Sequence, residues 1–305
     1  MDRKNEIKGH VFAFITIFIW GTTFIATKVL LEISSPTEIL FIRFTMGFIA
    51  LLVIYPQKLK IKEKKQEFYF AGAGLCGVTL YYLLENIALT YTFASNVGVI
   101  ISIAPFFTAI FAHLFLAGEK MRLPFFMGFA VAVIGIFLIS FNGSSNLQLN
   151  PLGDLLAVLA AVVWAIYSIL IKKISDFHYN TIQVTRRIFF YGLVFIIPVL
   201  FLLGFEPNGD KWIQPVNLFN ILFLGLGASA LCFVTWNSAV KLLGAVKTSV
   251  YIYMVPVITV MTSISVLNET ITGMTVLGIL LTVAGLFISE VKTSSNTKEL
   301  TRIHK

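Results

Sequence analysis

The stretch IFIWGTTFIATK, residues 17–28, decides the fold because a similar stretch, AVVWAIYSILIK, occurs at residues 161–172. Trp20 corresponds to Trp164 and Lys28 to Lys172, each 144 positions later. Both stretches are apolar enough to lie in a membrane, yet a helix that only anchors a protein needs neither a tryptophan nor a lysine. The correspondence indicates an internal repeat, and it raises the question of what Trp20 faces.

The composition of the 305 residues is typical of membrane proteins. Hydrophobic residues make up 57% and charged residues 12%, and the mean hydropathy is +0.88. Soluble domains are about 45–50% apolar and about 25% charged, because a soluble core needs polar surface to cover it. We therefore expect a polytopic membrane protein. We expect no nucleic-acid partner, because the distribution of the basic residues along the chain explains the net charge of +8.

A membrane-spanning helix needs about 20 mostly apolar residues, and the chain contains ten segments of this kind. Two of them carry clear start signals: Ser35, Pro36 and Glu38 form the pattern of a capping box with proline at the first helical position, and Asn150 precedes Pro151 in a similar way. The expected spans are 9–31, 37–55, 68–91, 94–117, 122–141, 152–173, 180–203, 217–240, 246–267 and 271–290.

The basic residues of the connections predict an orientation. If the N-terminus lies inside, eighteen lysines and arginines fall in inside segments, and the outside connections contain only Lys211. Cytoplasmic connections of membrane proteins carry such an excess, so both termini are expected in the cytoplasm. The polar tail, residues 291–305, is expected to be a disordered cytoplasmic segment.

The two halves of the chain match beyond the opening stretch. Arg43 corresponds to Arg187 at the same offset of 144, and further matches follow at offsets of 151 and 150. The predicted units are 8–141 and 150–290, each with five spans. Because five is odd, the second unit enters the membrane from the opposite side, which is the inverted-repeat architecture of many secondary transporters. The expected fold class is therefore an all-α membrane protein with ten transmembrane helices in two inverted five-helix repeats.

Several segments resemble the EamA family of the drug/metabolite transporter superfamily. They are WGTTFIATK at 20–28, Arg43, LENIALTYTFASNVGVIISIAPFFTAIFAHLFLAGEKM at 84–121 and NSAVKLLGAVKTSVYIYMVPVITVMTSISVLNETI at 237–271. The resemblance covers about residues 8–290 and implies a ten-helix carrier in a prokaryotic plasma membrane, without ATP hydrolysis or a cofactor. The chain has no GxxxxGK[ST] phosphate-binding loop, in agreement with that. The resemblance does not fix the substrate, because the family exports or imports amino acids, other metabolites and drugs.

Glu85 is the candidate for proton coupling, because an intramembrane carboxylate is costly and usually faces a cavity or a partner. It could couple protons or bind a substrate amine; alternatively, it could pair with Arg43 at similar depth. Arg43 and Arg187 could bind a substrate anion or make structural pairs. Pro105 and Pro256 are matched mid-span prolines that would kink their helices, as hinges or as static bends.

The remaining candidates are aromatic and amide side chains well inside the spans. Buried tryptophan N–H and tyrosine O–H groups need partners, and matched amides can bond to substrate or across helices. They could instead pack the core. With Glu85, the predicted substrate cavity contains Trp20, Thr23, Tyr82, Asn86, Trp164, Tyr167, Trp236, Asn237 and Tyr253.

The expected function is a secondary transporter of small organic metabolites, most simply an exporter that couples to protons or exchanges solutes. No metal-ligand spacing surrounds His113, and Cys76 and Cys232 lie in apolar runs that do not suggest a disulfide. The alternatives are an importer or exchanger of the same fold, or a non-transporting scaffold or channel. The expected partners are a small-molecule substrate and the lipid bilayer, and the protein is expected to be a monomer or homodimer.

Overall fold

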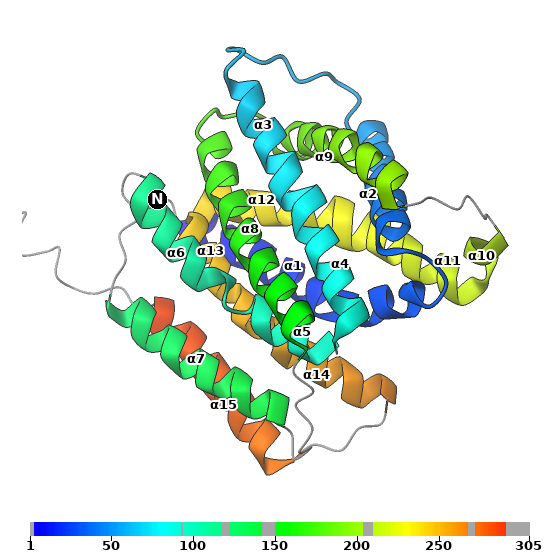
Figure 1. Ribbon diagram of the computed structural model, residues 1–305. Helices are drawn as coiled ribbons and strands as arrows, with labels where there is room; N and C mark the ends of the chain where they lie inside the picture. Colours follow the sequence, from blue (N-terminus) through cyan, green and yellow to red (C-terminus); the bar gives the residue numbers. More distant parts are fainter. Residues whose placement is uncertain are drawn as a thin grey trace, which may run out of the picture.

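The computed structural model describes residues 3–92, 94–116, 123–141, 150–203, 210–267 and 272–290, and within these residues the regular structure is helical throughout. The predicted tail 291–305 lies outside the described residues, and so do Glu119 and Glu269, which match each other at the offset of 150. Figure 1 shows the helices packed as one bundle.

The first half of the bundle contains seven α-helices and one π-helical segment among the described residues. They are α1 (Arg3–Leu31), α2 (Pro36–Ile54), α3 (Gln66–Gly74), η1 (Leu75–Leu80), α4 (Tyr81–Tyr91), α5 (Ala94–Ile101), α6 (Ala104–Phe115) and α7 (Leu123–Phe141).

The second half follows a similar order, with a short additional helix, α10, and an additional 3₁₀ turn, η3. Its elements are α8 (Pro151–Ser175), α9 (Thr181–Leu203), α10 (Asp210–Ile213), α11 (Pro215–Leu222), η2 (Phe223–Leu231), α12 (Cys232–Leu243), α13 (Ala245–Ser249), η3 (Val250–Tyr253), α14 (Met254–Leu267) and α15 (Gly273–Glu290).

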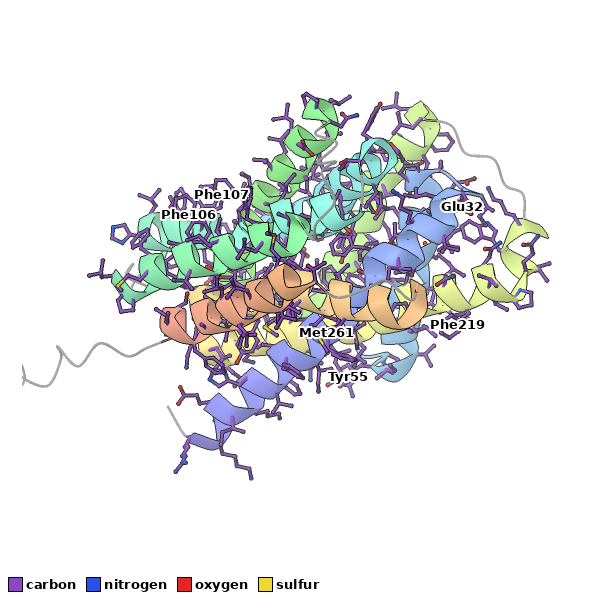
Figure 2. The ribbon with its side chains drawn as sticks, turned by 90° about the horizontal axis from the view of Figure 1, so that it is seen from below. Glu32, Tyr55, Phe106, Phe107, Phe219 and Met261 are labelled. Carbon is purple, nitrogen blue, oxygen red and sulfur yellow. The ribbon has the colours of Figure 1, made fainter. Side chains whose placement is uncertain are left out.

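Seven helical segments in the described residues are long and apolar enough to cross a membrane, and three shorter apolar helices accompany them. The outer surface of the bundle is apolar as well: Phe219 and Met261 lie on it in Figure 2, with 69% and 58% of their surface exposed. Large exposed apolar side chains are suited to a lipid environment rather than to water. The chain is therefore a multi-pass helical membrane protein.

The predicted helix starts are confirmed at two positions. The Ser35 hydroxyl accepts a hydrogen bond from the backbone N–H of Glu38 (3.3 Å), and the Glu38 carboxylate accepts one from the backbone N–H of Ser35 (3.3 Å), which is the reciprocal capping box. Before α8, the Asn150 side chain accepts hydrogen bonds from the backbone N–H groups of Leu152 and Gly153. These caps fix the residues at which α2 and α8 begin.

Two spans expected as continuous helices are interrupted. The segment 94–117 breaks between α5 and α6, and α6 begins one residue before Pro105. The segment 246–267 changes from α-helix to a 3₁₀ turn, Val250–Tyr253, and resumes as α14 two residues before Pro256. Proline has no N–H to donate to the preceding turn, but it is tolerated in the first turn of a helix, where that N–H has no partner anyway. Each helix therefore restarts with its proline in the first turn.

The third and eighth predicted spans instead remain continuous through π-helical segments, η1 and η2. Both lie in runs of small residues that permit close helix contact. A Cβ atom on Gly77 would lie 2.2 Å from the Tyr167 ring, and one on Gly74 would lie 2.7 Å from the backbone of Gly192. The wide turn η1 therefore occurs where α8 and α9 press closely against the first half, whereas η2 lies against α2 and α1.

Helices α7 and α15 lie side by side at one edge of the molecule (Figure 1). Glycines bring their backbones together: a Cβ atom on Gly128 would lie 2.4 Å from the Gly285 carbonyl oxygen, and one on Gly135 would lie 2.6 Å from the Gly278 carbonyl oxygen. Helices without glycine at these positions could not approach so closely. This pair stands apart from the aromatic centre of the bundle.

Candidate functional site

Three tryptophans from different helices meet at the centre of the bundle. The ring centroid of Trp20 on α1 lies 5.2 Å from those of both Trp164 on α8 and Trp236 on α12, and the latter two are 5.9 Å apart. Trp20 is held further by its indole N–H, which donates to the Ala228 carbonyl (2.9 Å). The repeat-related Trp20 and Trp164 are therefore in direct contact, and α1 and α8 meet through them.

A small cavity opens beside this tryptophan cluster. Its free volume is about 30 Å³, and since one buried water needs about 10–15 Å³ on the same measure, it has room for about two waters. A metabolite would enter only if the walls moved apart. The lining residues are Ile17, Trp20, Thr23, Phe24, Tyr81, Tyr82, Glu85, Ile101, Trp164, Ile252 and Val255.

Glu85 is the charged residue of the cavity wall. It is 3% exposed, and the neighbouring Tyr81 side chain interacts with its carboxyl group. Among the described residues Glu85 forms no ion pair. A carboxyl group in such apolar surroundings needs a cation, a proton or hydrogen-bond donors to be stable.

Arg43 lies over the ring of Tyr82 and is not among the residues that line the cavity. It is 1% exposed, its Nε–H donates to the Ser229 hydroxyl (3.0 Å), and its guanidinium carbon lies 4.4 Å from the centre of the Tyr82 ring. Its Nη2 has no hydrogen-bond partner among the described residues. Arg43 is thus near Glu85 and attracts it electrostatically, but the two groups do not form an ion pair in this conformation.

Arg187, the repeat counterpart of Arg43, has a different environment. It forms an ion pair with Glu67 on α3, and the Tyr191 hydroxyl also donates to Glu67 (2.6 Å). About a third of each charged side chain remains exposed. Arg187 does not line the cavity and joins α9 to α3.

The two predicted amides take part in contacts between helices. Asn237 accepts a hydrogen bond from the Tyr167 hydroxyl (2.7 Å) and donates to Thr185 (3.0 Å), which links α8, α12 and α9. Asn86 donates to the Pro36 carbonyl (3.4 Å) and thereby connects α4 with the start of α2. Neither amide lines the cavity.

The structure therefore brings part of the predicted set to the cavity and leaves the rest around it. Tyr253 is fully buried against Phe129, in the cluster between η3 and α7. Trp236 is fully buried behind the other two tryptophans. The cavity lining includes Trp20, Thr23, Tyr82, Glu85 and Trp164, whereas Asn86, Tyr167, Trp236, Asn237 and Tyr253 lie outside it.

Sequence reasoning missed the apolar part of the lining and Tyr81. Ile17, Phe24, Ile252 and Val255 look like any other membrane residue, so nothing in the sequence distinguished them. Tyr81 could have been found, since it lies one helical turn before Glu85 and on the same face of α4. No group of three or more histidine, cysteine, aspartate or glutamate residues that could hold a metal ion occurs among the described residues.

Comparison with known proteins gives a consistent result. The model of the EamA-like transporter family matches residues 7–141 and again residues 151–290. An uncharacterized transporter of Archaeoglobus fulgidus is 27% identical over 289 residues, covering 93% of this chain and 98% of the relative. A probable terminal-alkyne amino-acid exporter of Streptantibioticus cattleyicolor is 26% identical over 286 residues, covering 93% and 94%.

The fold also matches a solved structure. A protein of known crystal structure superposes with a TM-score of 0.76 at 19% identity, over 93% of this chain and 98% of that chain. At this identity the match concerns the arrangement of the helices and not the activity. The arrangement of the helices is thus one that a solved structure already shows.

Proposed function

Because the chain belongs to the EamA-like transporter family, we propose that it is a secondary active transporter that exports small organic metabolites, such as amino acids or drug-like compounds, by alternating access. It is a membrane transporter rather than an enzyme, as its family and the names of its relatives indicate. The observation that carries the finer proposal is Glu85, a carboxyl group without an ion-pair partner among the described residues, in the wall of an aromatic cavity between the two halves.

Two inverted repeats of five transmembrane helices each, at 8–141 and 150–290, are part of this proposal. The two separate matches to one family model support them. So do the matched interruptions next to Pro105 and Pro256 and the matched π-helical segments η1 and η2. Discontinuous helices near the midplane are a recurring feature of carriers built from such repeats.

The proposed location is a prokaryotic plasma membrane with both termini in the cytoplasm, on the evidence of the eighteen basic residues in the inside segments. Arg186 fits this orientation, because its guanidinium donates to the carbonyls of Tyr55 and Gln57 in the basic connection after α2. The proposed partners are a small-molecule substrate and the lipid bilayer, and the proposed assembly is a monomer or homodimer.

The position of Glu85 supports proton coupling through its carboxyl group. A carboxyl group that is reached from one side of the membrane at a time can take up a proton on one side and release it on the other, provided that substrate and proton exclude each other. The neutral side chain would remain in the apolar wall at little cost, whereas the charged one would favour a substrate cation or Arg43. The geometry also permits a second mode of transport, in which two solutes bind in turn to the same carboxylate and are exchanged across the membrane.

Transport into proteoliposomes with an imposed pH gradient tests the proposal, with a panel of radiolabelled amino acids and amphipathic amines as probes. Glu85→Gln should abolish gradient-driven accumulation, because glutamine cannot carry the proton. Glu67→Gln is the matched control: it removes a carboxyl group from the same helical span but outside the cavity, so that coupling should persist. Gradient-driven flux that is unchanged in Glu85→Gln would exclude the coupling role, and unitary currents in voltage-clamped bilayers would indicate a channel instead.

A further inference from the structure

We infer that the indole N–H of Trp164 is a specificity-determining group, which donates a hydrogen bond to an acceptor on the substrate while Glu85 takes the substrate's cationic group. The inference rests on the proposed function, since it names what the transported molecule must carry. It assigns different tasks to the repeat-related tryptophans: Trp164 recognises the substrate, and Trp20 holds the helices together.

The two tryptophans differ in the hydrogen bonding of their indole N–H groups. Trp20 Nε1–H donates to the Ala228 carbonyl at 2.9 Å, so its polar atom is already used within the protein. Trp164 is 3% exposed, and its Nε1 has no partner in the described structure. A buried donor without an acceptor costs about 1–3 kcal/mol, and such a cost is retained where a ligand supplies the missing acceptor. Trp164 also lines the cavity, where a ligand can reach it.

The rings around Trp164 hold its indole group in one orientation. Its ring centroid lies 4.7 Å from Tyr81, 4.9 Å from Tyr167 and 5.2 Å from Trp20. A donor fixed in this way loses little conformational entropy when a ligand binds. Trp236 has an unpartnered N–H as well, but it is fully buried and outside the cavity lining, so that a ligand cannot reach it without displacing the other rings.

The chemistry of the cavity then defines the ligand. Glu85 offers a carboxylate for an ammonium group, Trp164 offers a donor for a carboxylate or carbonyl oxygen, and the remaining wall is apolar, with Ile17, Phe24 and Val255 among its residues. A molecule with an amine, an acceptor and an apolar side chain satisfies all three. Leucine has these groups, isopentylamine is leucine without the carboxylate, and leucinamide keeps only a neutral acceptor.

Binding of these three probes to the purified protein in lipid nanodiscs, measured by calorimetry, tests the inference without requiring transport. The wild type should bind leucine most tightly, leucinamide less tightly and isopentylamine least. Trp164→Phe should weaken leucine binding about ten-fold or more, as expected for loss of a hydrogen bond to a charged group, and should leave isopentylamine binding nearly unchanged. Replacing Trp164 with 3-benzothienylalanine, which keeps the ring shape without the N–H, should give the same result even if the phenylalanine variant folds poorly.

The control is Trp20→Phe, which removes the bonded indole. It should lower the unfolding temperature and weaken the three probes alike, whereas the benzothienylalanine variant at residue 164 should keep the wild-type unfolding temperature. A wild type that binds leucine no better than isopentylamine overturns the inference, and so does an equal loss of all probes on removing the N–H of residue 164. If the proposed function is wrong, the result appears in the proteoliposome assay instead, as an absence of gradient-driven flux for every compound of the panel.

Discussion

At the scale of single residues, Arg43 donates a hydrogen bond to a neutral partner. Its Nε–H donates to Ser229, and both side chains are buried. We expect Ser229→Ala to destabilise the protein by about 1–3 kcal/mol, because a charged donor would be left without its acceptor. Ser168→Ala is the control: Ser168 is equally buried but donates only to the Trp164 carbonyl one turn earlier, so its loss should cost less. Thermal unfolding in detergent measures the stability of both variants. Equal losses of stability would show that the hydrogen bond to Arg43 contributes no more than the local hydrogen bond of Ser168.

The residues of the site show what a sequence reveals and what it hides. A charge or a tryptophan deep in an apolar span is conspicuous, so the sequence alone predicts Glu85, Trp20 and Trp164 as cavity residues. Whether such a group faces the cavity or a neighbouring helix depends on the rotation of its helix. Arg43 and Arg187 match in sequence, yet one donates to Ser229 and the other to Glu67, because the surrounding helices supply different partners.

At the scale of elements, the closest packing in the bundle depends on glycine. A Cβ atom on Gly285 would lie 2.5 Å from the backbone nitrogen of Ala132, so Gly285→Ala must push α15 away from α7. We expect a loss of about 1–3 kcal/mol from this overpacking. Gly273→Ala on the same helix has nothing within 4 Å of the added carbon and should be neutral or slightly stabilising. Thermal unfolding of both variants tests the contact; equal unfolding temperatures would contradict it.

Elements that are distant in sequence are also joined by an ion pair of unusual burial. Glu38 on α2 and Lys211 on α10 are 2.8 Å apart, with side chains only 4% and 17% exposed. A second ion pair joins Lys172 and Asp176 at 3.0 Å, but 64% of the Asp176 side chain is exposed. We expect Glu38→Gln to lower stability by about 1–3 kcal/mol, because Lys211 loses its partner in a nearly dry site, and Asp176→Asn by about 0.5 kcal/mol or less. Chemical denaturation at low and high salt measures the stability of both variants. Similar losses of stability in the two variants would contradict the expected difference between the buried and the exposed ion pair.

The elements themselves were largely predictable, and their interruptions were not. Length and hydropathy predict the seven long apolar helices that the described residues contain, and the caps at Ser35 and Asn150 follow from local chemistry. Pro105 and Pro256 predicted kinks, but the structure breaks both helices and inserts a 3₁₀ turn at Val250–Tyr253. The π-helical segments had no signal beyond small residues, because they arise from packing between helices that the sequence order does not reveal.

At the scale of the whole molecule, the proposed inverted repeats make an unusual prediction about the two prolines. If the repeats exchange conformations during transport, the helix at Pro105 has in the outward-open state the conformation that the helix at Pro256 has in the inward-open state, and the reverse. Pro105→Ala, which allows a straighter helix, should then favour one state, and Pro256→Ala should favour the other. The double variant should return the populations towards those of the wild type, since opposed shifts in free energy add for distant sites.

Accessibility of the cavity from each side of the membrane measures these populations. A single cysteine in place of Thr23, which lines the cavity, would be introduced into a background with Cys76 and Cys232 replaced. A membrane-impermeant thiol reagent applied to right-side-out and inside-out vesicles then reports the open side. Opposite changes in the ratio of the two labelling rates are expected for the single variants, and a ratio near the wild-type value for the double variant. Shifts in the same direction would contradict the exchange of roles, because two static bends have no reason to oppose each other.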